Sequence, residues 1–227
     1  IAVLLFSFII IFHELGHFLL AKKNGIRVDE FSLGLGPTLL GKQIGETKFS
    51  LKLLPFGGAC MMGEDDADDL SEGSFNSKSV WARMSVVAAG PIFNLILACV
   101  FCFILIMITG YRSPEITGVL DGYSAQEEGL QAGDVITEIN GRNVHIWDDV
   151  SLYTMTHADE APFKVEYERD GKKYTAKLEP RQLEGDAAPL LGVTSGDIVK
   201  PGIFKSVEYS IYKVKYWMNY TVDSLRM

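Results

Sequence analysis

Two histidines and a glutamate stand inside the apolar segment that opens the chain, IAVLLFSFIIIFHELGHFLLAKK. His13 and His17 are four residues apart, so in a helix both imidazoles project from one face, about one turn apart. Two such nitrogens can hold one Zn²⁺ at roughly 2.0–2.1 Å each. Glu14 lies about 100° around the helix from His13. There it can take a proton from zinc-bound water and later deliver it to a leaving amine.

The His-Glu-x-x-His pattern is a signature of zinc metalloproteases, and its surroundings strengthen that interpretation. In soluble proteins the same pattern also occurs by chance. A charged group at the middle of a membrane-spanning helix, however, costs roughly 2.5–3.5 kcal/mol on insertion scales. Three ionisable residues in such a place therefore indicate a Zn²⁺ site. Gly16, inside the motif, leaves room for another backbone or a substrate to approach.

Two apolar stretches are long enough to cross a lipid bilayer. Residues 1–21 and 86–110 are nearly all apolar, and about 20 such residues cross a hydrocarbon core of roughly 30 Å. The formal net charge is −8 and the chain has no basic tract, which argues against a nucleic-acid partner. We therefore expect a membrane α-helical protein with two transmembrane helices in this chain. Because the first residue is Ile, we expect the start of the first span to be missing.

The second apolar stretch also carries polar chemistry. Gly90 and Asn94 are four residues apart and so share a helix face. A glycine lets helices approach closely, and an asparagine in lipid needs a partner. Three roles are open for Asn94: it binds the substrate backbone, it holds a group behind the metal ligands, or it only packs the helices together.

Two loop segments extend the motif into a resemblance. Residues 25–37 read GIRVDEFSLGLGP and residues 47–64 read TKFSLKLLPFGGACMMGE. Together with HELGH and the Gly-Pro and Asn pattern of the second span, they resemble the site-2 protease family of intramembrane zinc proteases, in the bacterial branch typified by the regulator of sigma-E protease. The resemblance implies a zinc-dependent endopeptidase of the bacterial inner membrane, multi-pass, that cleaves single-span membrane proteins. Anti-sigma factors and signal-peptide remnants are substrates of this kind.

The resemblance also implies a third zinc ligand. A catalytic zinc usually has three protein ligands plus water, and in the family the third is an aspartate of a Leu-Asp-Gly motif on a later membrane helix. Leu120-Asp121-Gly122 spells that motif, but it ends a predicted strand and no apolar helix surrounds it. We therefore do not assign Asp121 as a ligand. We expect the third ligand beyond Met227, and this chain to be the N-terminal part of a longer protein.

Residues 22–85 are expected to form a cytoplasmic loop. Basic residues near the span ends favour the cytoplasmic side; they are Lys22, Lys23, Arg27, Lys78 and Arg83. The alternation over Lys48–Leu54 predicts a strand, which we expect Pro55–Gly58 to end. The resemblance implies a membrane-associated β-hairpin that dips towards the active site and pairs with an extended substrate. An ordinary amphipathic hairpin on the membrane surface is the alternative. The acidic run at residues 64–70 predicts a solvated turn.

Residues 111–185 predict an extracytoplasmic α+β domain. The stretch GLQAGDVITEINGRNV, residues 129–144, has the turn and strand pattern of a PDZ domain. A helix is predicted over 147–158, and Asp170-Gly171 predicts a β-hairpin. PDZ folds bind peptide ends by strand addition, so peptide ends are the expected partner. His145 and His157 are expected at the surface or in turns and not at the zinc.

The last segment, residues 186–227, contains an amphipathic stretch with many Tyr and Trp residues. It predicts an interfacial helix that leads into later spans. Two other classes of protein remain open. The first is a catalytically silent, membrane-anchored PDZ adaptor, which would hold no stoichiometric zinc. The second is a soluble-type zinc peptidase whose first helix is buried in a core.

Overall fold

A computed structural model describes residues 2–63, 69–184 and 189–225 of the chain. The chain divides into two compact units, residues 1–98 and 99–227. The first unit holds α1 (Ala2–Lys23), β1 (Glu30–Ile44), β2 (Thr47–Met61) and the first part of α2. Helix α2 (Val80–Thr109) continues into the second unit, which contains all remaining elements. The predicted turn at 64–70 falls mostly on residues outside this description.

Helices α1 and α2 are long and apolar enough to cross a membrane by length and composition. Only 11% of the apolar window of each helix is buried. A first helix whose apolar side chains face outward does not serve as the core of a soluble domain, which argues against the soluble-type peptidase. Helix α2 begins at Val80, before the apolar stretch, because Ser79 Oγ accepts a hydrogen bond from the Ala82 amide at 3.3 Å and caps the helix.

Strands β1 and β2 pair with each other and fold over into a sheet of four segments, in which residues 30–33 run antiparallel to 58–61 and in the same direction as 48–51. Residues 40–44 of β1 lie opposite residues 47–51 of β2, while residues 30–33 lie opposite both 48–51 and 58–61. The expectation that Pro55–Gly58 ends the strand is wrong, because β2 continues to Met61. Gly57 has a φ of +87° and bends the chain there, so that β2 meets β1 a second time.

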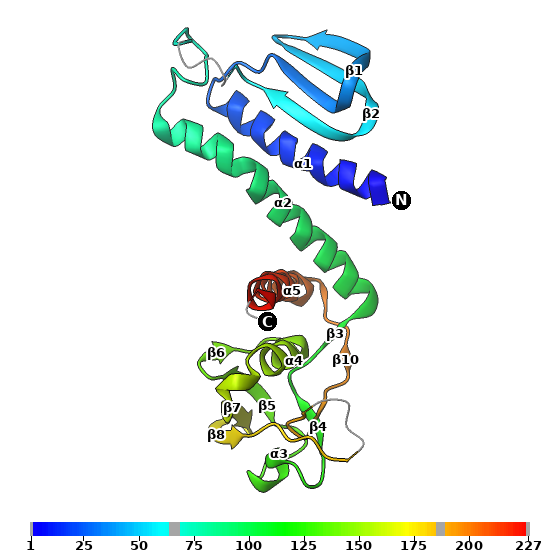
Figure 1. Cartoon of the computed structure of the whole chain (residues 1–227), viewed down its shortest axis with the longest axis vertical. Helices are drawn as coiled ribbons and strands as arrows, with labels where there is room; N and C mark the ends of the chain where they lie inside the picture. The colour runs from blue at the N-terminus through cyan, green and yellow to red at the C-terminus, as the bar shows by residue number, and fades with distance from the viewer. Residues whose placement is uncertain (1, 64–68, 185–188, 226–227) are drawn as a thin grey trace. The chain divides into compact units, whose positions relative to one another are not determined.

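The folded sheet packs on α1, and Figure 1 shows it along that helix. Its contact with the helices is a small cluster of buried apolar residues, Ala21, Ile26, Val28, Phe31, Cys60, Met62 and Val86. Members of this cluster come from both helices and both strands. The sheet is therefore fixed to the same two helices that carry the sequence-predicted site.

The second unit is an α+β fold. Its largest sheet has the order β6-β5-β7-β8, formed by β5 (Val135–Ile139), β6 (Arg142–Asn143), β7 (Phe163–Arg169) and β8 (Lys172–Leu178). Two short pairs join β4 (Ile116–Val119) to β9 (Val193–Ser195), and β3 (Tyr111–Arg112) to β10 (Ile198–Val199). The helices are α3 (Ser124–Glu127), α4 (Trp147–Thr156), the 3-10 helix η1 (Ala158–Glu160) and α5 (Ile203–Ser224).

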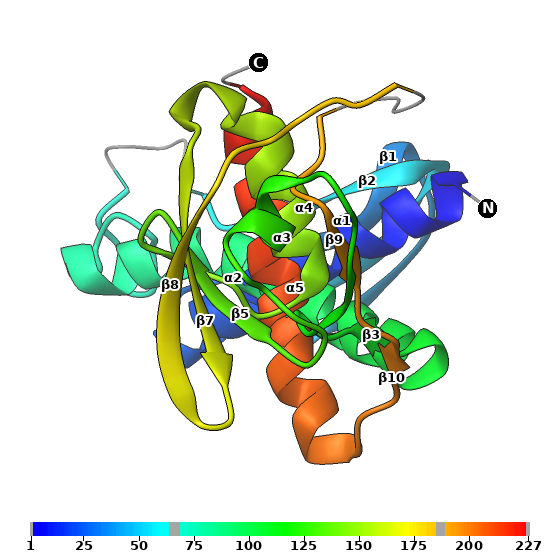
Figure 2. The ribbon, with the colours of Figure 1, turned by 90° about the horizontal axis from the view of Figure 1, so that it is seen from below.

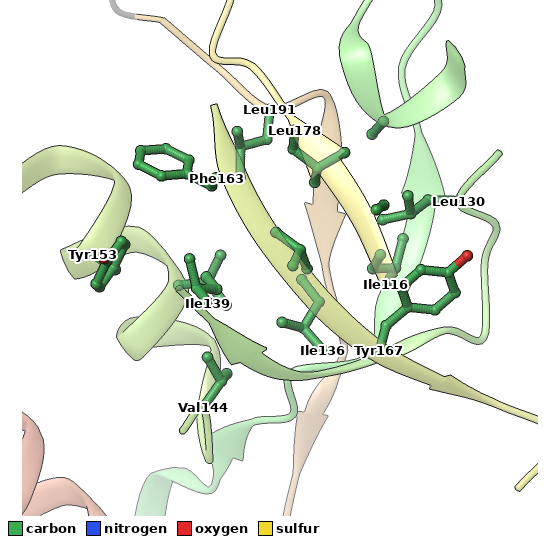
Figure 3. Packing of buried hydrophobic residues seen from close by; sticks show 14 residues of the cluster. Ile116, Leu130, Ile136, Ile139, Val144, Tyr153, Phe163, Tyr167, Leu178 and Leu191 are labelled. Atoms are coloured by element: carbon green, nitrogen blue, oxygen red, sulfur yellow. The ribbon is translucent and has the colours of Figure 1, made fainter. Parts of the chain in front are cut away.

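Turn chemistry sets the register of the large sheet. Asp170 and Gly171, with φ of +51° and +73°, join β7 to β8 in the predicted hairpin, which is confirmed. Asn140 and Gly141 join β5 to β6 with φ of +46° and +83°. The inward side chains form one apolar core (Figure 3), which includes Ile116, Ile136, Ile139, Phe163, Val165 and Leu178.

Helix α4 lies beside α5 in the second unit (Figure 2). The ring of His145, just before α4, stacks on Tyr212 of α5 at 3.9 Å between centroids. His157 ends α4 and bonds Thr156 Oγ1 through Nδ1 at 2.7 Å. It lies in a turn, as expected, but it is buried, because the ring of Tyr153 stacks on it at 4.4 Å.

Candidate metal centre

Helix α1 brings His13 and His17 together on one face. Their ring centroids are 4.8 Å apart and the rings are nearly perpendicular. Both side chains are half-buried, because the first part of α2 covers this face of α1. The four-residue spacing therefore has the effect expected from the sequence: two imidazoles stand side by side.

Helix α2 holds the Nδ1 atom of each ring. His17 Nδ1 lies 2.8 Å from the carbonyl oxygen of Val86. His13 Nδ1 lies 3.0 Å from the side-chain amide of Asn94. Because the helices run in opposite directions, the later histidine meets the earlier residue of α2. Each ring is thus fixed through its Nδ1 atom, and the Nε2 atom is the one that can bind a metal ion.

The two Nε2 atoms meet beside Gly90. A Cβ placed on Gly90 would lie 2.6 Å from His13 Cε1, and closer still to the Nε2 atoms of both rings. The missing side chain therefore lets both Nε2 atoms come together against the backbone of α2, an arrangement that we call the Gly90 cradle. An ion bound by two imidazoles sits roughly 2.0–2.1 Å from each nitrogen. The cradle thus brings two metal-binding nitrogens to one place and excludes every side chain at position 90.

Close contact between the helices also depends on Gly16. A Cβ on Gly16 would lie 2.6 Å from the carbonyl oxygen of Ala89 and 3.0 Å from the ring of Phe93. Gly16 of α1 therefore faces α2, and Gly90 of α2 faces α1. This matches the expectation that Gly16 leaves room for another backbone.

Glu14 faces the folded sheet. A Cβ on Gly58 of β2 would lie 3.3 Å from Glu14 Cγ and 3.6 Å from Ile10 Cγ2. Ser7 Oγ, one helix turn before Ile10, donates a hydrogen bond to the carbonyl oxygen of Pro55. The glutamate thus stands between the histidine face of α1 and the segment of β2 that follows the bend at Gly57.

The described residues bring together His13, Glu14, His17 and Asn94 among the candidates from the sequence. In the part of the chain that the structure describes, no three or more His, Cys, Asp or Glu side chains come together as a group that could hold a metal ion. Asp121 lies in a turn of the second unit and accepts a hydrogen bond from Gln126 Nε2 at 2.6 Å.

Two contributors were missed by sequence reasoning. The Val86 carbonyl belongs to the backbone, so no residue type could signal it. Gly58 stands in the PFGG stretch, which was taken to end a strand. Its signal was the pair of glycines, because two adjacent glycines also allow a backbone to approach another group closely.

Comparison with known proteins identifies a protein family and several relatives of this chain. Residues 1–227 match the profile of Peptidase family M50. The chain is 37% identical over 227 residues to a protein named "Putative zinc metalloprotease" from Clostridium acetobutylicum, covering 100% of this chain and 67% of that one. It is 28% identical over 290 residues to Zinc metalloprotease RasP from Bacillus licheniformis, covering 91% and 69%. A "Putative zinc metalloprotease" from Campylobacter jejuni is 37% identical over 190 residues, covering 81% and 50%. The chain thus spans about half to two thirds of these relatives.

Two solved structures resemble part of the chain. One is the PDZ domain of an SdrC-like protein from Listeria monocytogenes, with 24% identity and a TM-score of 0.31, covering 37% of this chain and 88% of that one. The other is the HtrA3 PDZ domain bound to a phage-derived ligand, with 21% identity and a TM-score of 0.25, covering 39% and 88%.

Proposed function

The chain belongs to peptidase family M50, and from this premise we propose that the protein is a zinc-dependent intramembrane endopeptidase. His13 and His17 bind the metal through Nε2, and Glu14 is the general base. One observation carries this proposal: both Nε2 atoms line the Gly90 cradle while both Nδ1 atoms are engaged by α2. The third protein ligand is an aspartate beyond Met227.

The chemistry proposed is the hydrolysis of a peptide bond. When bound, zinc supplies Lewis-acid chemistry, namely polarisation of the scissile carbonyl and acidification of a water molecule. Glu14 accepts a proton from that water as its oxygen bonds to the carbonyl carbon. The C–N bond then breaks, and Glu14 returns the proton to the leaving amine. Low surrounding polarity strengthens these charge interactions.

The substrates we propose are single-span membrane proteins. A helical substrate must unwind before its peptide bond can be attacked, and an exposed strand edge can hold an unwound chain by backbone hydrogen bonds. Among the described residues, residues 58–61 of β2 pair only with residues 30–33 of β1, and we propose that their other edge receives the unwound substrate. Gly58 lies beside Glu14 on this segment, which brings the held chain next to the general base.

The location of the protein and the roles of its other segments are also proposed. Family membership and the two apolar helices together point to a membrane protein. We propose a multi-pass protein of the bacterial inner membrane, with residues 22–85 in the cytoplasm and residues 111–185 on the other side of the membrane. Residues 111–185 act as a PDZ domain that binds peptide ends. Helix α5 lies in the membrane interface through its exposed apolar side chains, Ile203, Phe204, Val207, Ile211, Met218 and Val222.

Two variants of the intact protein test this function in membranes. Glu14→Gln should keep stoichiometric zinc and lose cleavage of a single-span reporter substrate. His17→Ala should lose both. A PDZ adaptor would instead hold no stoichiometric zinc and keep its function in Glu14→Gln, and that result would overturn the proposal.

A further inference from the structure

Three successive turns of α2 face the two histidines. Val86, Gly90 and Asn94 are spaced four residues apart and lie on one stripe of the helix. Val86 meets His17, Gly90 meets both rings, and Asn94 meets His13. The stripe therefore combines one backbone acceptor, one glycine and one side-chain amide.

The contact with Val86 fixes the tautomer of His17. A carbonyl oxygen can only accept a hydrogen bond, so at 2.8 Å His17 Nδ1 must carry the proton and donate it. In a neutral imidazole the other nitrogen then has a lone pair. His17 Nε2 thus faces the Gly90 cradle as a metal-binding atom.

The contact with Asn94 has the opposite polarity. The amide nitrogen Nδ2 faces His13 Nδ1 at 3.0 Å, and Nδ2 can only donate. His13 Nδ1 would then accept, which puts the ring proton on Nε2 inside the cradle. In the same arrangement Asn94 Oδ1 is a buried atom with no hydrogen-bond partner among the described residues. This orientation of the amide thus leaves His13 Nε2 protonated and Asn94 Oδ1 unpaired.

A half-turn of the amide about the Cβ–Cγ bond corrects the pairing with His13, and it replaces the unpaired buried oxygen with N–H donors. It exchanges two groups of nearly equal size, so the surrounding packing does not change. Oδ1 then accepts a hydrogen bond from His13 Nδ1–H, and His13 Nε2 turns its lone pair to the cradle. The N–H groups stand where Oδ1 was, available to a peptide carbonyl, which is compatible with the substrate contact expected for Asn94.

We propose that Asn94, when zinc is bound, turns Oδ1 to His13 Nδ1 and so sets the tautomer and orientation of that ligand. This inference rests on the proposed function. Asn94 is then a positioning residue, because it acts on the metal through His13. Polar groups that receive the second N–H of a ligating histidine typically change metal affinity about 10–100-fold when they are removed.

Zinc affinity, measured by chelator competition on the intact protein, tests the inference. Asn94→Leu removes the acceptor and should weaken zinc binding about 10–100-fold. Asn94→Asp keeps an acceptor oxygen and should restore most of the affinity. The matched control is Asn24→Leu, because Asn24, just after α1, bonds Ser85 Oγ of α2 through Nδ2 at 3.0 Å, so this variant loses a contact with α2 that involves neither imidazole ring. Its zinc affinity should fall much less than that of Asn94→Leu.

Wild-type affinity in Asn94→Leu would overturn the inference. So would an equal loss in Asn24→Leu, which would reduce Asn94 to a packing residue. A second measurement does not depend on folding of a variant: nitrogen-15 NMR of labelled histidine in the zinc-loaded protein should show His13 protonated at Nδ1 and metal-bound at Nε2. The reverse pattern would contradict the inference. Zinc retained by His17→Ala would instead refute the proposed function itself.

Discussion

His17 Nδ1 lies 2.8 Å from the carbonyl oxygen of Val86, across the interface between α1 and α2. A carbonyl on a helix moves only with the helix, so the orientation of this ring depends on how closely α1 and α2 pack. The close approach depends in turn on Gly16, whose Cα side faces the Ala89 carbonyl. Helix packing and the proposed metal binding by His17 are therefore linked through the backbone.

Substitution of Gly16 should break that link. Gly16→Val places a branched side chain where even a Cβ would lie 2.6 Å from the Ala89 oxygen. Overpacking of this kind costs about 1–3 kcal/mol of stability, and it should separate the helices and weaken zinc binding. Zinc titration and thermal unfolding in detergent measure both effects. Ala2→Leu, an addition of bulk at an exposed position of α1, should change neither. Unaltered zinc affinity in Gly16→Val would contradict the link.

Filling the Gly90 cradle should remove the metal while leaving the helix intact. Gly90→Ala puts a methyl group against both Nε2 atoms, and alanine favours the helix over glycine by about 1 kcal/mol. We therefore expect loss of bound zinc with unchanged helix content, measured by metal analysis and circular dichroism. Ala88→Val is the control, because Ala88 is exposed on the same helix. Full zinc occupancy in Gly90→Ala would show that the metal lies elsewhere.

Sequence reasoning proposed metal ligands but not the groups that support them. His13, Glu14 and His17 became candidates because ionisable residues in an apolar helix are costly without a function. Asn94 was recognised as polar in lipid, yet its partner depends on how α2 lies against α1, and three roles stayed open. The Val86 carbonyl carries no sequence signal at all.

The fold was predictable where local chemistry decides it. Asp170-Gly171 fixed a hairpin because both residues accept positive φ. Pro55–Gly58 was misjudged because glycine and proline signal a break in a single strand. Here they form a bend that lets β2 pair with β1 twice, which depends on contacts far apart in the chain.

The position of Glu14 against β2 gives a prediction about catalysis. Gly58→Val adds a branched side chain where even a Cβ would lie 3.3 Å from Glu14 Cγ and 3.1 Å from the Ser32 carbonyl oxygen. It should displace the carboxylate and reduce reporter cleavage about 10–100-fold, since small displacements of a catalytic group have effects of that order. Zinc content should stay at the wild-type level, because the histidines are untouched. Equal cleavage by Gly58→Val and the unmodified protein would show that the folded sheet does not position Glu14 for catalysis.

The second unit depends on a buried ion pair. Burial alone would raise the pKa of Asp134, but Arg169 and the Gln131 amide hydrogen-bond its carboxylate and hold the pKa below its ordinary value. Arg169→Met should therefore leave a buried carboxylate without its cation and destabilise β5 and β7. Amide hydrogen exchange of these strands in the detergent-solubilised protein should accelerate several-fold. The matched control is Arg181→Met, which breaks a pair with Glu127 at the surface and should have a much smaller effect. Equal exchange in both variants would contradict the assigned role of the buried pair.

We propose that one metal ion is held by two imidazoles at the interface of α1 and α2. Zinc K-edge X-ray absorption on the intact, membrane-reconstituted protein is the decisive measurement. We expect nitrogen and oxygen neighbours at roughly 2.0–2.1 Å, with the outer-shell scattering of two imidazole rings, and loss of that scattering in the double variant His13→Ala, His17→Ala. A zinc spectrum that is the same with and without these two histidines would contradict it.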